Sequence, residues 1–305
     1  MKKLFLALSV LVAITYLISC NSSSASDAVE LKFKLPKGKK YEYAMNMEMQ
    51  MNQEIMGKKM DMKNDMGFTY LFEVTNDSSE WKTVSSTISK INMDMSANGR
   101  TMHFDTDMPA TDSGPTATMG KVFGAMKGSQ FSFTVNDKGD IGEVKGIKEM
   151  QDRMLSAMPN GGGEGAAEGL SKSFDEDGLK QNMQQAFSAY PGKPVKVGDS
   201  WTKTTTQKIQ GMTIKSDNVY TLESVKGNDA TVKLSSKLNL ANSGEVNPAQ
   251  MTMTGTSEGK THYDLETGMT TDGDLDMKMD MKIKVNNTEL PMSMNMKMKI
   301  KGKKI

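Results

Sequence analysis

Strict alternation of apolar and polar residues is the dominant pattern along this chain. Between residues 45 and 51 every second residue is methionine, and the residues between them are Asn, Glu and Gln. The same alternation recurs near the C-terminus, at Met277, Met279, Met281, Met292, Met294, Met296 and Met298. Because successive side chains of a β-strand point to opposite faces, this pattern predicts strands with one apolar and one polar face.

Two turn signals make the pairing of these strands predictable. With Asn286-Asn287 as a two-residue turn, every apolar position of the two flanking runs falls on one face, in the pairs Met281–Met292, Met279–Met294, Met277–Met296 and Leu275–Met298. With Asn98-Gly99 as a turn, Met95 faces Met102 and Met93 faces Phe104. His103 then faces Asp94 on the opposite side of the sheet.

An internal repeat indicates that the β-structure is duplicated. The segment 70–74 reads Tyr-Leu-Phe-Glu-Val, and the segment 220–225 reads Tyr-Thr-Leu-Glu-Ser-Val, each followed by Thr-Val and then Ser-Lys. The first copy carries one extra residue between Thr-Val and Ser-Lys, and its apolar positions change parity there. This predicts a β-bulge within residues 85–89 of the first copy.

The period changes to that of a helix in the middle of the chain. Apolar residues at helical spacing predict helices over 116–127, 147–157 and 174–190, with a hairpin over 131–145 between the first two. The segment 159–165 contains four glycines and is predicted to be a flexible loop.

These patterns predict a mainly β protein in which an antiparallel meander occurs twice. The β-structure forms a curved sheet, a half-barrel or two packed β halves, with a short helical insertion in the middle. We expect an N-terminal β half at 30–146, the insertion with its Gly-rich loop at 147–191, and a C-terminal β half at 192–305.

The first residues predict that the protein is located in the cell envelope. Lys2 and Lys3 precede a run of fifteen mostly apolar residues, 4–18, which is short for a membrane span and typical of a signal peptide. Ser19-Cys20 follows and resembles a lipoprotein cleavage site. We therefore expect a signal peptide at 1–19, a tether at 20–29, and palmitate and diacylglycerol on Cys20. The residues after Cys20 lack an acidic cluster, which by analogy favours an outer-membrane lipoprotein that faces the periplasm.

Several short motifs together resemble a known group of sequences. They are the cleavage site, the Lys-Gly-Lys-Lys-Tyr run at 37–41, the Asp-Lys-Gly-Asp turn at 137–140, Glu-Val-Lys-Gly at 143–146 and Pro-Val-Lys-Val-Gly-Asp-Ser-Trp at 194–201. The chain resembles an uncharacterised family of lipoproteins of Bacteroidota-type bacteria, for which no activity or site is known. Its layout is also loosely similar to half-barrels that carry lipids or lipoproteins across the periplasm.

Composition and charge exclude several classes of function. The chain has 30 Met but one Cys and two His, which excludes a disulfide scaffold and any site that needs several histidines. Without Lys2 and Lys3 it has 36 basic and 37 acidic residues, interspersed, so nucleic-acid binding has no electrostatic support.

Residues 255–259 match Gly-x-Ser-x-Gly, but a strand follows instead of a helix, so we predict no catalytic residue and no enzyme. A weak surface calcium site at 272–276 stays open.

Two interpretations of the methionines remain. Thioethers bind Cu(I), and Met45, Met47, Met49 and Met51 could converge on one ion from one face of a strand. No histidine lies on the predicted Met side, however, so an apolar face is favoured over a metal site. Because Met is flexible, we expect a soft surface for a hydrophobic small molecule or lipid at Met277, Met279, Met281, Met292, Met294, Met296 and Met298. The leading prediction is a non-catalytic protein without cofactors, bound to the membrane by its lipid anchor, that binds or carries a hydrophobic ligand or acts as an envelope scaffold. A periplasmic Cu(I)-binding protein is the alternative.

Overall fold

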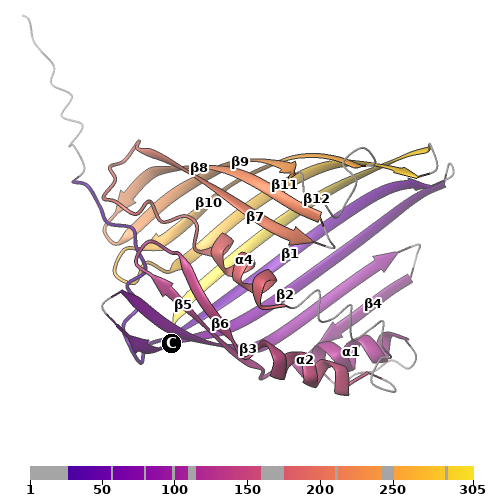
Figure 1. Cartoon of the computed structure of the whole chain (residues 1–305), viewed down its shortest axis with the longest axis horizontal. Coiled ribbons are helices and arrows are strands. Elements are labelled where there is room, and N and C mark those ends of the chain that lie inside the picture. The colour runs from indigo at the N-terminus through magenta and orange to yellow at the C-terminus, as the bar shows by residue number, and fades with distance from the viewer. Residues whose placement is uncertain are drawn as a thin grey trace, which may run out of the picture.

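The computed structural model describes residues 27–55, 58–78, 80–97, 100–108, 115–158, 175–209, 212–241, 251–285 and 288–305, and these contain one antiparallel sheet of twelve strands (Figure 1). The first six strands are β1 (Lys40–Ile55), β2 (Lys58–Asp77), β3 (Trp81–Ala97), β4 (Arg100–Asp105), β5 (Gln130–Asn136) and β6 (Ile141–Lys145). The second six are β7 (Ser200–Ile209), β8 (Met212–Lys226), β9 (Asp229–Leu240), β10 (Met251–Asp264), β11 (Thr270–Val285) and β12 (Thr288–Lys304).

The first and last strands of the chain, β1 and β12, pair in the middle of the sheet and join its two halves. The strand order is β6-β5-β3-β2-β1-β12-β11-β10-β9-β8-β7. Strand β4 lies off this path and pairs with β3. Each half is an antiparallel meander, and β1 pairs with β12 along thirteen residue pairs. The predicted mainly β fold with a repeated meander is therefore confirmed, in the form of one curved, unclosed sheet.

The predicted strand registers are confirmed by the pairing. In the β11–β12 pair Met281 lies opposite Met292 and Leu275 lies opposite Met298. In the β3–β4 pair Asp94 lies opposite His103. The turn residues themselves, 286–287 and 98–99, lie outside the described residues.

The predicted bulge in the first half is also present. Thr69 pairs with Lys90 and Tyr70 pairs with Ile88, so Ser89 is the extra residue of β3. Its hydroxyl donates a hydrogen bond to the Thr69 carbonyl at 3.0 Å. The bulge restores Ile91 to the same face as Ile88, which explains the change of parity in the sequence.

The described residues contain the helices α1 (Pro115–Met126), α2 (Ile147–Ser156) and α4 (Glu176–Ala186) beside the sheet. The first two match the predicted segments. Helix α4 is shorter than the predicted 174–190: it is capped by Asp175, whose carboxylate accepts from the Gly178 N–H. At the other end the chain leaves the helix so that Phe187 and Tyr190 can enter the core. The predicted loop at 159–165 lies outside the described residues.

Helix α4 bridges the two free edges of the sheet, because it contacts both β6 and β7 (Figure 1). Gln184 accepts from the Ile141 N–H at 2.9 Å and donates to the Gly139 carbonyl at 3.0 Å. On the other side Asn182 accepts from the Gln207 amide at 2.6 Å. Because a single helix contacts both edges, the sheet curls around the face that carries the core. We call this face the inward face.

One end of this inward face is filled by a packed core. Leu31, Phe33 and Leu35 of the N-terminal segment are buried there, and Val29 pairs with Val195 beside them. Aromatic residues from both halves complete the core, and burial raises the pKa of the Tyr263 phenol. Within the described part of the chain, no helix combines the length and the apolar character that crossing a membrane requires.

Candidate functional site

Beyond the packed core, the inward face of the sheet consists mainly of methionine side chains. We call this surface the Met face. It lies on β1, β2, β11 and β12 and consists of Met45, Met47, Met49, Met51, Met62, Met66, Met277, Met279, Met281, Met292, Met294, Met296 and Met298. All residues predicted as the hydrophobic face and all those of the copper alternative lie on it.

The methionines form rows that run across the strands. Directly opposed residues of neighbouring strands share a face, with Cβ atoms about 4.5–5.5 Å apart. The rows, each written strand by strand, are Met66–Met47–Met298, Met49–Met296–Met277 and Met62–Met51–Met294–Met279. The sequence predicted the pairs between β11 and β12, and the structure adds the neighbouring thioethers of β1 and β2.

Most of the Met face is half-buried. Met277 and Met279 are buried in a small cluster with Ile214, Leu238 and Met253, and all members of that cluster come from strands. The methionines of β1, β2 and β12 keep part of their surface exposed. The outward face of the same strands is polar, so the sheet separates an exposed polar side from an apolar, partly accessible inner side.

Helix α1 covers only one corner of this inner side. A small pocket lies there, lined by Met93, Met95, Met102, His103, Phe104, Gly120 and Phe123. Its enclosed volume is about 10 Å³, which is close to the space of one water molecule. The pocket is therefore too small for an organic ligand.

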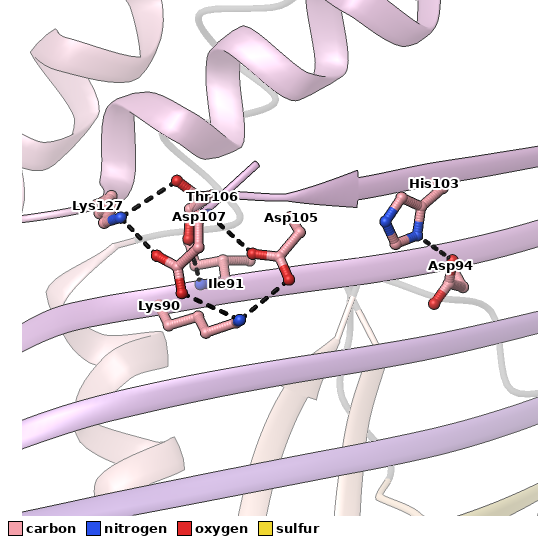
Figure 2. A network of polar contacts seen from close by, with 8 residues as sticks. All are labelled: Lys90, Ile91, Asp94, His103, Asp105, Thr106, Asp107 and Lys127. Atoms are coloured by element: carbon pink, nitrogen blue, oxygen red, sulfur yellow. Dashed lines mark hydrogen bonds and ion pairs between the residues drawn. The ribbon is translucent and has the colours of Figure 1, made fainter. Parts of the chain in front are cut away.

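Figure 2 shows how charged groups fix α1 at that corner. Lys90 of β3 binds the carboxylates of Asp105 and Asp107, each at 3.0 Å, and Asp107 also accepts from Lys127 at 2.6 Å, just after α1. The hydrogen bond from Lys127, together with that from Lys90, lowers the pKa of Asp107. Burial by itself raises the pKa of Asp105, but the Asp107 N–H and Lys90 outweigh it and the net shift is downward.

A polar track crosses the inward face beside the Met face. Asn218 of β8 donates to Thr205 of β7 at 3.1 Å and accepts from Ser236 of β9 at 2.6 Å. Ser257 of β10 lies directly opposite Ser236 on one side and Met277 on the other. It is 3% exposed, and its hydroxyl has no hydrogen-bond partner. Sequence reasoning considered Ser257 only within the rejected Gly-x-Ser-x-Gly match, and it missed the track, because Asn218 and Ser236 are ordinary strand residues.

The ring of each histidine binds a carboxylate, and neither histidine is part of the Met face. The His103 ring binds the Asp94 carboxylate at 2.5 Å and the His262 ring binds Asp229 at 3.0 Å, and both alternate with residues of the inward face. Among the described residues no group of three or more His, Cys, Asp or Glu side chains is placed to hold a metal ion. Cys20, the predicted lipid attachment site, lies outside the described residues.

The chain belongs to a family of unknown function, DUF6263, whose model matches residues 79–270. The resemblance to an uncharacterised family is thereby confirmed. A comparison with curated proteins found no match.

Among solved structures, the sheet is similar to that of lipovitellin, with a TM-score of 0.51 and 9% identity. The lipovitellin structure was described under the heading of lipid–protein interactions. The match covers 88% of this chain and 25% of the lipovitellin chain, so this protein spans about a quarter of its length. The translocator domain of the autotransporter NalP from Neisseria meningitidis matches with a TM-score of 0.23 and 8% identity, over 87% of this chain and 88% of that one. The likeness to lipovitellin concerns the fold alone, and the second score is too low to support an argument.

Proposed function

We propose that this protein is a non-catalytic binding protein of the cell envelope that holds the acyl chain of a lipid or similar hydrophobic molecule on its Met face. The observation that carries the proposal is the half-burial of the methionine rows inside a curled sheet. An apolar surface of this size is costly in water unless a ligand covers it. The likeness to lipovitellin, whose structure was studied for its lipid contacts, is in keeping with this role.

The choice of methionine over valine or leucine supports an irregular ligand. The thioether side chain is unbranched and polarizable, so a row of methionines can adapt to chains of different length and curvature. Each methylene group that a ligand buries contributes about 0.8 kcal/mol, so micromolar binding, about 8 kcal/mol, requires burial of an acyl chain of more than about ten methylenes once the cost of association is included.

Ligand binding is testable with the apolar dye N-phenyl-1-naphthylamine. We expect saturable fluorescence enhancement by the full chain, reversed by methyl laurate. Met296→Gln places an amide in the centre of the face and should weaken binding about tenfold, whereas Asn295→Gln on the outward face of the same strand should leave it unchanged. Absence of saturation, or an equal effect of both variants, would rule the proposal out.

Lipid anchoring in the outer membrane is a separate part of the proposal. We infer from Lys2, Lys3, the apolar run 4–18 and Cys20 that the chain is lipidated and anchored in the outer membrane, facing the periplasm. Cells grown with labelled palmitate should incorporate label into the wild-type protein and not into Cys20→Ala. Label retained by the variant, or absent from both, would contradict this inference.

A second candidate function is Cu(I) binding, and one row of the Met face favours it. Met62, Met51, Met294 and Met279 bring four thioethers together from four adjacent strands. Soft thioether ligands suit Cu(I). Titration of the folded chain with Cu(I) under reducing conditions separates the two functions, because a metal site should saturate at a fixed stoichiometry and should not be displaced by methyl laurate.

A further inference from the structure

Ser257 is a buried polar residue of the inward face whose hydroxyl has no hydrogen-bond partner among the described residues. Burial of an unpaired hydroxyl is unfavourable, and most buried hydroxyls in proteins find a hydrogen-bond partner. Ser236, directly opposite on β9, donates its own hydrogen bond to Asn218 at 2.6 Å. The polar track thus ends one residue short of Ser257, at the border of the Met face.

The surroundings of Ser257 are apolar and small. On the same face of β10 its neighbours are Gly255 and Gly259, and across the β11 side lies Met277. The Met279 side chain lies over Gly255, where a Cβ atom would be 2.8 Å from its Cγ. Ser257 is 3% exposed and its inward-facing neighbours on β10 and β11 are these glycines and methionines, so we expect rotation of the flexible methionine side chains to open its hydroxyl to a ligand on the Met face.

From this geometry we propose that Ser257 donates a hydrogen bond to a neutral polar group, such as an ester carbonyl, of an acyl ligand whose chain lies along the methionine rows. This inference rests on the proposed function and names the class of ligand. Glu258, the next residue of β10, lies on the opposite face of the sheet, and the inward-facing neighbours of Ser257 on β9, β10 and β11 are uncharged, so a carboxylate there would be desolvated without a counter-charge.

The test compares dodecane with methyl laurate as competitors of N-phenyl-1-naphthylamine on the full chain. Ser257→Ala should weaken methyl laurate about fivefold, equivalent to about 1 kcal/mol, and should leave dodecane unchanged. The matched control is Ser86→Ala, which removes the other buried unpartnered serine hydroxyl, located between Phe72 and Phe131 in the packed core. It should change neither competitor.

The outcomes separate this inference from the proposed function. Equal effects of Ser257→Ala on both competitors, or none on either, would overturn the role of Ser257 while leaving acyl binding intact. Tighter binding of laurate than of methyl laurate would overturn the assignment of a neutral group. If neither competitor displaces the dye from the wild-type chain, the proposed function fails as well.

The urea midpoint of Ser257→Ala should equal or exceed that of the wild type, because an unpaired buried hydroxyl is removed.

Discussion

Close packing between distant parts of this chain depends on a single glycine in one turn. Gly268, in the turn between β10 and β11, has φ +75° and lies against the backbone of Lys32 and Phe33. Tyr190 donates a hydrogen bond to its carbonyl at 2.8 Å. The N-terminal segment can therefore pack against this turn only because residue 268 has no side chain.

Gly268→Ala is expected to lower the free energy of unfolding by about 3 kcal/mol or more. The added methyl group meets the Lys32 carbonyl, and the left-handed conformation adds about 1 kcal/mol. Gly38→Ala is the matched control, since Gly38 has φ +73° and open space around its Cα. Urea denaturation of both variants should give a loss of only about 1 kcal/mol for the control, and equal losses would contradict the steric explanation.

At the scale of elements, α1 is held at the sheet by charge as well as by packing. The lowered pKa of Asp105 and Asp107 shows that their charged forms are favoured in the folded protein. A carboxyl group with a lowered pKa stabilises the fold at pH values above its ordinary pKa of 3.8, and this contribution is lost as the pH falls through the lowered value.

We therefore expect the attachment of α1 to weaken at acidic pH. Hydrogen exchange of the α1 amides, corrected for the intrinsic rate, should show constant protection down to about pH 4 and a decline below it. Asp107→Asn removes the charge that links Lys90 and Lys127, so it should lower the protection at neutral pH and reduce its dependence on pH. An unchanged profile in the variant would assign the decline to other groups.

At the scale of the whole molecule, one helix connects the two edges of a curved, unclosed sheet. The edge strands β6 and β7 are far apart in the strand order, yet Gln184 holds the β5–β6 hairpin and Asn182 holds β7. Lys203 of β7 also donates directly to the Lys138 carbonyl in the hairpin turn, at 3.2 Å. Burial lowers the pKa of this lysine.

Gln184→Ala should loosen this closure. It removes two hydrogen bonds to the hairpin backbone, which corresponds to a loss of about 1–3 kcal/mol in the free energy of unfolding. Amides of β6 and of β7 should exchange faster together, because both edges depend on α4. Lys180→Ala, at an exposed position of the same helix, is the control and should leave exchange unchanged. Faster exchange in β6 alone would show that the two edges are independent.

Much of the fold was predictable because its signals are local. Alternating methionines define the strands, and a pair of turn residues sets the register of β11 against β12. The parity change in the first repeat located the bulge at Ser89. The candidate site was predictable only in part. The methionines and their pairing across β11 and β12 were predicted, but the polar track was missed and Ser257 was considered only as a possible catalytic serine, since serine and asparagine in strands carry no distinctive pattern.

The sequence by itself therefore determined which residues form strands, which face of each strand is apolar, and that the meander is repeated. These properties depend on side-chain alternation and turn chemistry within a few residues. Only the tertiary structure decided that β1 pairs with β12 and that α4 brings the outer edges together. It also decided that Leu31, Phe33 and Leu35 fill one end of the inward face and that the methionines remain half-buried at the other. The physical reason is that apolar faces attract each other without directional preference, so contacts between distant segments determine which of them become core and which become surface.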